Sequence, residues 1–202
     1  MGLRERKKLA TRRALKDAAV RLVLEHGLEN VTVDEIAAAG EVSTRTFFNY
    51  FGSKEDALLG DLPFGPDDEC VSVFVAGGPS GDFTDDLVHL LTDSLDQGED
   101  LASWREEARI NWELTEREPQ LMSGMLARMH DVEVQIAEAV AGRTGADGGD
   151  QSPKLIAGVA AAVVRHVLGE AGAARSEETV EEIRTHMRDA FDRLGHTFAP
   201  RP

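Results

Sequence analysis

The chain has few of the features that mark secreted or membrane-embedded proteins. Of its 202 residues only Cys70 is a cysteine, which excludes an internal disulfide bond and fits a reducing compartment. No run of eighteen apolar residues occurs, so we expect no membrane-spanning helix. The N-terminal segment lacks the apolar stretch and the small-residue cleavage site of a secretory signal. These absences predict a cytoplasmic protein with no membrane partner.

Motifs of catalytic and metal-binding sites are also missing. The six histidines and the single cysteine do not show the spacing of HExxH or CxxC zinc motifs. No GxSxG, P-loop or GxGxxG motif occurs, and the glycine-rich stretch Thr144–Asp150 lacks the lysine and the preceding strand of a phosphate loop. We therefore expect no catalytic residues, no metal site and no cofactor, and we predict that the protein is not an enzyme.

Charge is distributed unevenly along the chain. The net charge is −15, yet residues 1–24 contain eight basic and two acidic residues, whereas residues 61–202 contain 12 basic and 28 acidic residues. A basic run by itself is weak evidence of function, because many such runs are simply solvated faces. An acidic surface repels phosphate, however, so only the N-terminal part could present a surface to nucleic acid.

Helix signals are dense in the first forty residues. A basic segment, Arg4–Lys8, is expected to form a flexible arm. Apolar residues spaced three and four apart then predict a helix from about Leu9 to His26. Thr32 and Glu35 form a capping box at the start of a second helix. The residues expected on the buried side of this second helix are Ile36, Ala37 and Ala39.

The following residues predict a tight turn and two further short helices. Gly40 would supply the positive φ that a sharp turn between helices requires. Ser43 is placed to cap a third helix, Thr44–Phe51, and Ser53 is placed to cap a fourth, Lys54–Asp61. This succession of helix, turn and helix is typical of a helix-turn-helix unit.

The segment Val31–Leu59 resembles the DNA-binding signature of TetR-type transcriptional regulators. The matching groups, in order, are Val31-Thr32, Ile36-Ala37, Ala39-Gly40, Val42-Ser43, Phe47–Phe51, Ser53–Glu55 and Ala57-Leu58. The resemblance implies an all-α fold of about nine helices, with a helix-turn-helix DNA-binding domain over residues 1–60 and a larger domain for effector binding and dimerisation over residues 61–202. It also implies a ligand-responsive repressor that binds a palindromic operator as a homodimer and is released by a small-molecule effector.

The third helix is the predicted reader of DNA sequence. Phe47 and Phe51 lie four residues apart and would face the first two helices. The residues expected to point away from that core are Thr44, Arg45, Phe48 and Asn49. Arg45 can donate two hydrogen bonds to guanine and Asn49 can pair with adenine, each contributing about 1–3 kcal/mol of discrimination. The alternative is that Arg45 contacts only phosphate.

Other positions are expected to contact the DNA backbone. Thr32 and Ser43 lie at helix N-termini, where hydroxyls and free amides suit phosphate. The resemblance implies phosphate contacts for Tyr50 and Lys54. The basic residues that could reach the backbone or the minor groove are Arg6, Lys7, Lys8 and Arg12. Two residues depart from the family pattern: Phe48 replaces the common tyrosine, and Arg45 replaces a small residue, often glycine. The operator therefore does not follow from that of better-known relatives.

Residues beyond 61 predict further helices separated by loops. Leu62–Asp68 contains two prolines and a glycine and marks a break, and Cys70–Ala76 is expected as an extended segment or a short helix. The longer helices are expected over Thr84–Gln97, with Thr84 as its cap, Leu101–Glu118, Pro119–Arg143, Ser152 to Gly169–Gly172, and from Ser176 or Thr179 to Leu194.

Large adaptable side chains between residues 101 and 129 suggest a pocket for the effector. The predicted lining residues are Trp104, Arg109, Trp112, Met122, Met125 and Met129. For each of them ordinary core packing is the alternative, and for Arg109 an ion pair with Glu113 is at least as good an explanation. A buried arginine or histidine in such a pocket could orient a polar group of the effector.

The last two predicted helices, residues 152–172 and 176–194, are expected to form a dimer interface. The first is apolar almost all round and rich in small residues, and the second is amphipathic, so together they could supply half of an intermolecular four-helix bundle. The expected partners are thus double-stranded DNA, a small-molecule effector and a second copy of the chain. The competing hypothesis is a helical small-molecule-binding module without sequence-specific DNA binding, which the intact helix caps and Arg45 argue against.

Overall fold

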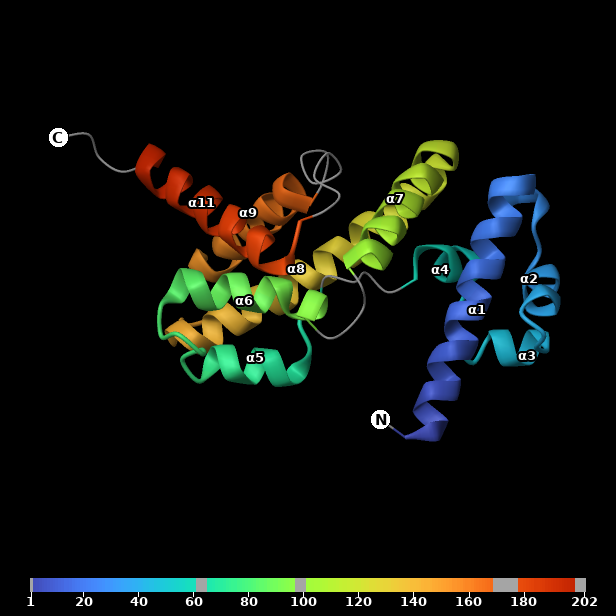
Figure 1. The fold of residues 1–202 in the computed structure, drawn as a ribbon, viewed down its shortest axis with the longest axis horizontal. Helices are drawn as coiled ribbons and strands as arrows, with labels where there is room; N and C mark the ends of the chain where they lie inside the picture. The colour runs from blue at the N-terminus through green and yellow to red at the C-terminus, as the bar shows by residue number, and fades with distance from the viewer. Residues whose placement is uncertain (1, 61–64, 97–100, 169–177, 199–202) are drawn as a thin grey trace. The chain divides into compact units, whose positions relative to one another are not determined.

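The computed structural model describes residues 2–60, 65–96, 101–168 and 178–198. Within these ranges the chain forms ten α-helices and two short 3-10 helices, and no strand (Figure 1). The predicted all-α fold is confirmed. The chain divides into two compact units, the first formed by Met1–Leu62 with Ala108–Arg128 and the second by Pro63–Glu107 with Met129–Pro202.

The first unit is built around helix α1, which spans Leu3–His26. Helix α1 begins earlier than predicted, so the proposed flexible arm, Arg4–Lys8, is helical instead. The physical reason is composition, because this stretch consists of unbranched helix-forming residues with neither glycine nor proline. After the 3-10 helix η1, Leu28–Asn30, come α2, Val33–Ala39, and α3, Thr44–Phe47. Figure 1 shows α2 and α3 beside α1.

The helix caps of the first unit were predicted correctly. Thr32 and Glu35 form the capping box of α2, Ser43 accepts from the backbone of Thr46 at the start of α3, and Ser53 accepts from Asp56 at the start of α4, Lys54–Leu59. Ile36 and Ala37 are buried as expected. Ala39, in contrast, is exposed, because it lies on the outer side of this short helix.

The turn between α2 and α3 differs from the prediction. Gly40 has φ −85°, and the positive φ of 57° falls on Glu41. A Cβ atom at Gly40 would lie 2.6 Å from Cδ2 of Leu15 in α1. The glycine is therefore required by the close approach of α1 and α2 and not by its own backbone conformation.

Helix α3 is also shorter than the predicted Thr44–Phe51. After Phe47 the chain forms a turn in which the amides of Asn49 and Tyr50 donate to the carbonyls three residues earlier. This tightening brings the chain round so that Phe51 returns to the core. The core of the first unit combines these aromatics with buried residues of every surrounding segment: Leu15, Ala19, Val23, Leu28, Val31, Ile36, Phe47, Phe51, Leu58, Leu114 and Leu121.

The second unit contains α5, Asp68–Val75, α6, Phe83–Asp96, α9, Ser152–Leu168, and α11, Val180–Phe198. Helices α7, Leu101–Arg117, and α8, Met122–Thr144, contribute residues to both units, and the 3-10 helix η2, Pro119–Leu121, lies between them in sequence. Helix α11 packs on α6 and on α9. Helix α6 buries four leucines at helical spacing: Leu87, Leu90, Leu91 and Leu95.

Three details of the second unit refine the predictions. The segment Cys70–Ala76 is helical, as one of its two expected alternatives. Helix α6 is capped by Asp82, whose carboxylate accepts from the Asp85 amide at 2.9 Å, so the prediction of Thr84 as the cap is wrong. The last helix begins after Thr179, which forms a capping box with Glu182, and it extends past the predicted end at Leu194 to Phe198.

A buried ion pair joins α6 to α8. The side chain of Asp86 is fully buried and lies 2.7 Å from Nη2 of Arg143. Ser80 donates its amide and its hydroxyl to the same carboxylate, each at 2.8 Å, and the Arg143 guanidinium lies over the Phe74 ring. Burial acts to raise the pKa of Asp86, but the hydrogen bonds from Ser80 and Arg143 and the charge of Arg143 outweigh it and hold the pKa below its ordinary value.

Two further observations bear on what the chain can do. Burial, with Asp93 nearby, raises the pKa of the Cys70 thiol to about 12, so this half-buried cysteine stays a neutral thiol at physiological pH. None of the helices in the described residues combines the length and the apolarity needed to cross a bilayer.

Candidate nucleic-acid interface

The residues predicted to read bases are carried by α3 and the turn that follows it. Phe47 and Phe51 are buried in the core of the first unit, as their spacing predicted. Arg45 and Asn49 are exposed, and Phe48 has 54% of its surface exposed. The Phe48 ring packs edge-on against the buried Phe47 ring, with the two centroids 5.5 Å apart, and its exposed surface is available for contact with another molecule.

A hydrogen bond fixes the start of α3 against the start of α2. The Thr44 hydroxyl donates to the Asp34 carboxylate at 2.6 Å, and the Ser43 hydroxyl accepts from the Thr46 amide at 3.1 Å. The N-termini of α2 and α3, which carry the predicted phosphate contacts Thr32 and Ser43, are thereby linked. Because free amides at helix N-termini attract anions, two such N-termini tied together suit a DNA backbone.

The capping box of α2 is held by a charged acceptor. The Glu35 carboxylate accepts from the amide and the hydroxyl of Thr32, each at 2.8 Å. These hydrogen bonds lower the pKa of Glu35, the backbone one most. The Thr32 hydroxyl is thus committed to the cap and would reach phosphate only by sharing its lone pairs.

Arg12 supports the aromatic turn from behind. Its Nη1 donates to the Tyr50 carbonyl at 2.8 Å, and its guanidinium carbon lies 4.5 Å from the centre of the Phe51 ring. This half-buried arginine therefore acts inside the unit, whereas the other basic residues predicted to approach DNA, Arg6, Lys7 and Lys8, are exposed on α1. Tyr50 itself is half-buried and packs against the core.

Lys54 is not fully free to contact phosphate, because its ammonium group already forms hydrogen bonds within the first unit. Its Nζ donates to the carbonyls of Leu28, at 2.5 Å, and Val31, at 2.9 Å. An ammonium group has three donors, so one N–H remains for any external acceptor. Lys54 chiefly joins the start of α4 to η1, the segment that leads into the helix-turn-helix.

The corner between α7 and α8 also forms hydrogen bonds that hold the first unit together. Glu118 Oε1 accepts from the Leu28 amide at 2.8 Å, and Arg128 donates to the Gly60 carbonyl at 3.1 Å and to the Asp56 carboxylate at 2.9 Å. Leu114 and Leu121 of this corner are buried in the core of the first unit. The sequence does not predict these contacts, because partners 68 to 90 positions apart leave no local pattern.

The six residues predicted to line an effector pocket lie in different surroundings. Trp112 has 63% of its surface exposed, Met122 is also exposed, and Arg109 forms the ion pair with Glu113 that was its alternative, at 3.1 Å. Met125 packs against the core of the first unit and Met129 is half-buried in the second. The Trp104 side chain lies outside the described residues.

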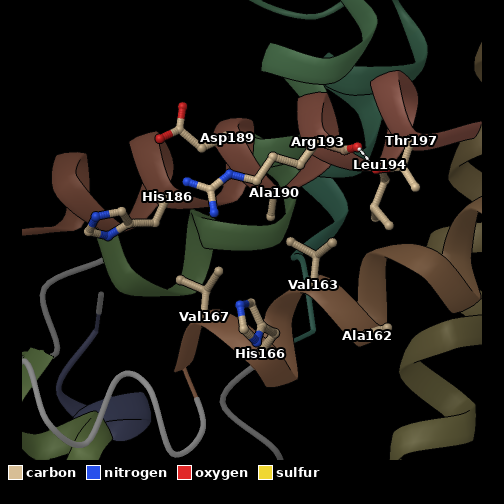
Figure 2. Close-up of a pocket in the computed structure, with 10 residues that line it drawn as sticks. All are labelled: Ala162, Val163, His166, Val167, His186, Asp189, Ala190, Arg193, Leu194 and Thr197. Atoms are coloured by element: carbon tan, nitrogen blue, oxygen red, sulfur yellow. Dashed lines mark hydrogen bonds between the residues drawn. The ribbon is translucent and has the colours of Figure 1, made fainter. Parts of the chain in front are cut away.

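A groove does occur elsewhere, between α9 and α11. It encloses about 400 Å³. Figure 2 shows its lining, with small and branched apolar side chains between the two helices and polar ones along its edges. The lining residues are Ala162, Val163, His166, Val167, His186, Asp189, Ala190, Arg193, Leu194 and Thr197. These are residues of the two helices that the sequence predicts to meet a second copy of the chain.

Comparison with known proteins connects both regions to one family. Residues 15–59 match the model of the tetR family of bacterial regulatory proteins, and residues 97–199 match the model of the MftR C-terminal domain. The chain is 33% identical over 203 residues to the HTH-type transcriptional regulator TcmR of Streptomyces glaucescens, a match that covers 96% of this chain and 86% of that protein. It is 48% identical over 48 residues, 24% of this chain and 23% of the other, to the HTH-type transcriptional regulator BetI of Agrobacterium fabrum.

Solved structures show the same fold. A Mesorhizobium loti protein assigned to the TetR family aligns with a TM-score of 0.53 at 17% identity, over 93% of this chain and 96% of the other. GusR of Salmonella enterica aligns with a TM-score of 0.50 at 19% identity, over 89% of this chain and 94% of the other. At these identities the likeness concerns the fold alone.

Proposed function

The chain belongs to the tetR family of bacterial regulatory proteins, and from this premise we propose a ligand-responsive repressor that binds a palindromic operator as a homodimer. Membership makes it a transcriptional regulator with an N-terminal DNA-binding domain, and not an enzyme. Repression, the effector and the homodimer are the parts that we propose. We keep residues 1–60 as the DNA-binding domain and residues 61–202 as the domain for effector binding and dimerisation.

The observation that carries the proposal is the exposure of Arg45, Phe48 and Asn49 opposite the buried Phe47 and Phe51. A short helix can enter the major groove with its first residues at the base edges. Arg45 would then donate to guanine and Asn49 would pair with adenine. Phe48 has no hydroxyl for phosphate, so its contact would be with a thymine methyl group or a sugar.

The phosphate contacts are proposed in a modified form. Thr32, Ser43 and Thr44 would position the two linked helix N-termini on the backbone, chiefly through amides, because their hydroxyls already serve the caps and Asp34. Tyr50 remains a proposed contact. Lys54 would contribute only its remaining N–H, since it already donates to the carbonyls of Leu28 and Val31.

The homodimer is supported by apolar surface that one chain leaves uncovered. Leu155 and Val159 of α9 are 69% and 43% exposed, and Phe198 of α11 is 81% exposed. On a solvated helix such side chains would be a cost, whereas a second copy would bury them. Two-fold pairing would also set two recognition turns on successive half-sites of a palindrome.

The effector is proposed as a small molecule that biases DNA binding. Its proposed contacts remain in the segment 101–129, with Arg109, Trp112, Met125 and Met129 as candidates beside Trp104 and Met122. The clamps of Glu118 on Leu28 and of Arg128 on Asp56 belong to the same segment. We propose that the effector acts through this corner, because movement of the corner would displace both η1 and α4. An effector can shift the balance only as far as it prefers one state.

The test is selection of binding sites from random DNA by the full chain, followed by gel shifts across salt concentrations. We expect a palindrome and binding that weakens steeply with salt. Arg45→Ala and Asn49→Ala should change the preferred base within each half-site, while Arg21→Ala, a matched charge loss at an exposed residue of α1 that is not a predicted contact, should leave the selected sequence unchanged. No enrichment, with no binding up to micromolar protein, would instead support a helical module without sequence-specific DNA binding.

A further inference from the structure

The arginines with described side chains beyond residue 105 are, with one exception, committed to ion pairs inside the chain. The pairs, with N–O distances of 2.7–3.8 Å, are Arg109–Glu113, Arg117–Glu113, Arg128–Asp56, Arg143–Asp86, Arg165–Glu133, Arg184–Glu181 and Arg188–Asp85. Arg193 is the exception within the described residues. Because residues 61–202 contain 28 acidic residues and 12 basic ones, an arginine that forms no ion pair among the described residues is unexpected there.

Arg193 lines the groove between α9 and α11 together with Asp189, one helical turn earlier. Both side chains are exposed, and Asp189 likewise has no ion pair among the described residues. Figure 2 shows the Arg193 guanidinium turned towards Ala190, with the Asp189 carboxylate pointing away from α9. The lining of the groove thus includes one basic and one acidic residue of α11, with the small residue Ala190 next to Asp189.

The rest of this surface is apolar in the pattern of one helix face. Leu155, Val159 and Ala162 are exposed on α9 at spacings of four and three, and they lead to His166 at the groove. Leu194 adds an exposed apolar side chain from α11. His186, also at the groove, lies 3.2 Å from Glu178 of its own chain.

We propose that this groove pairs with the same groove of a second copy, and that Asp189 of each copy forms an ion pair with Arg193 of the other. A contact about a two-fold axis is isologous, so residue i meets residue j and j meets i. Two antiparallel α11 helices crossing near Ala190 would bring each Asp189 opposite the partner's Arg193 and satisfy both pairs at once. The small side chain of Ala190 permits this close crossing.

The occupant is a second copy because the surface is complementary to itself. Two strongly acidic domains repel each other, so their association requires opposite charges placed to meet. Opposite charges at positions related by the two-fold axis meet this requirement, and a surface carrying only acidic groups would not. The inference rests on the homodimer proposed above and identifies Asp189 and Arg193 as residues that favour pairing with an identical chain.

The experiment uses two charge reversals in the full chain, Asp189→Arg and Arg193→Asp. Each variant alone would place like charges opposite each other twice per dimer. An equimolar mixture would restore both attractive pairs, because one chain then carries two basic groups and the other two acidic groups. Asp192→Arg is the matched control, since Asp192 is exposed on α11 but does not line the groove. Sedimentation equilibrium gives the dimer dissociation constant, and circular dichroism verifies folding.

We expect a dimeric wild type and control, at least a roughly tenfold weaker dimer for each reversal, and recovery to within about threefold in the mixture. A dimeric wild type whose reversals change the dissociation constant by less than about twofold, or a mixture no tighter than its components, would overturn the ion-pair assignment while sparing the homodimer. A monomeric wild type would overturn both. If that monomer bound the fluorophore 1-anilinonaphthalene-8-sulfonate and Ala190→Trp abolished binding, the groove would be a small-molecule site.

Discussion

The recognition turn and the α9–α11 groove both expose polar and apolar side chains, yet they are built in different ways. Arg45 in α3, and Phe48 and Asn49 after it, belong to a short segment of the first unit in which Ser43, Arg12 and Lys54 form hydrogen bonds with the backbone. The groove lies on two long helices held mainly by apolar packing. The difference shows that the base-reading residues depend on hydrogen bonds to hold them in place, because a short helix has little packing surface of its own.

The largest expected effect concerns the buried Asp86–Arg143 ion pair of the second unit. Arg143→Met would leave the Asp86 carboxylate buried without its ion-pair partner and lower the free energy of unfolding by about 3–5 kcal/mol. Urea denaturation followed by circular dichroism measures this. Arg165→Met, which removes a half-exposed pair with Glu133, should cost no more than about 1 kcal/mol. Equal effects would contradict the account of the buried pair.

The next prediction concerns the hydrogen bonds that hold the helix-turn-helix in place. Lys54→Met would leave the carbonyls of Leu28 and Val31 without their donor and destabilise the first unit by about 1–3 kcal/mol. Thermal denaturation reports the loss, and gel shifts over salt report any phosphate contact. Lys7→Met, on the exposed side of α1, should leave stability unchanged. If the two variants were equally stable, the hydrogen bonds of Lys54 would not stabilise the first unit.

Substitutions of one glycine in each unit are expected to have smaller effects on stability. A Cβ at Gly40 would collide with buried Leu15, so Gly40→Ala should destabilise the chain by about 1–3 kcal/mol. At Gly195 in α11 a Cβ meets nothing within 4 Å, so Gly195→Ala should stabilise it by about 0.5–1 kcal/mol through helix propensity. The two changes, measured by thermal denaturation, should therefore have opposite signs, and the same sign for both would refute this explanation.

The last prediction concerns the loss of stability of the second unit in acid, which has the smallest effect at neutral pH. The pKa of Asp86 is lowered on folding, so its contribution to stability is fully present above the ordinary value near 3.8 and is lost as pH falls through the lower pKa of the folded state. Unfolding midpoints followed from pH 7 to pH 2 should drop most steeply below about pH 4. Asp86→Asn should flatten that drop, and an unchanged pH profile would argue against the assignment.

The sequence predicted the first unit far better than the second. The caps at Thr32, Ser43 and Ser53 were predictable because they act over three residues, and the burial of Phe47 and Phe51 followed from helical spacing. Local patterns could not predict that Gly40 is required by contact with Leu15, or that Glu118 reaches Leu28. Both depend on residues that only the fold brings together.

The predicted pocket shows the limit of composition as evidence. Trp112 and Met122 were grouped because large apolar side chains often line pockets, but on the folded helices they are exposed, and Arg109 takes the ion pair that its spacing to Glu113 allows. The prediction that α9 and α11 form a dimer interface rests on a different pattern, because a helix that is apolar on all sides needs more neighbours than one chain supplies, and it stays a prediction.

The most direct test of the central claim, that the exposed residues of α3 and of the turn after it read bases, is a series of single base-pair substitutions in the selected operator. Binding of wild type and of Arg45→Ala would be measured by fluorescence anisotropy at several salt concentrations. We predict that Arg45→Ala loses about 1–3 kcal/mol of discrimination at one position of each half-site and keeps it elsewhere. A uniform loss across all sequences, with a reduced salt slope and discrimination intact, would show that Arg45 contacts only phosphate and would contradict the account.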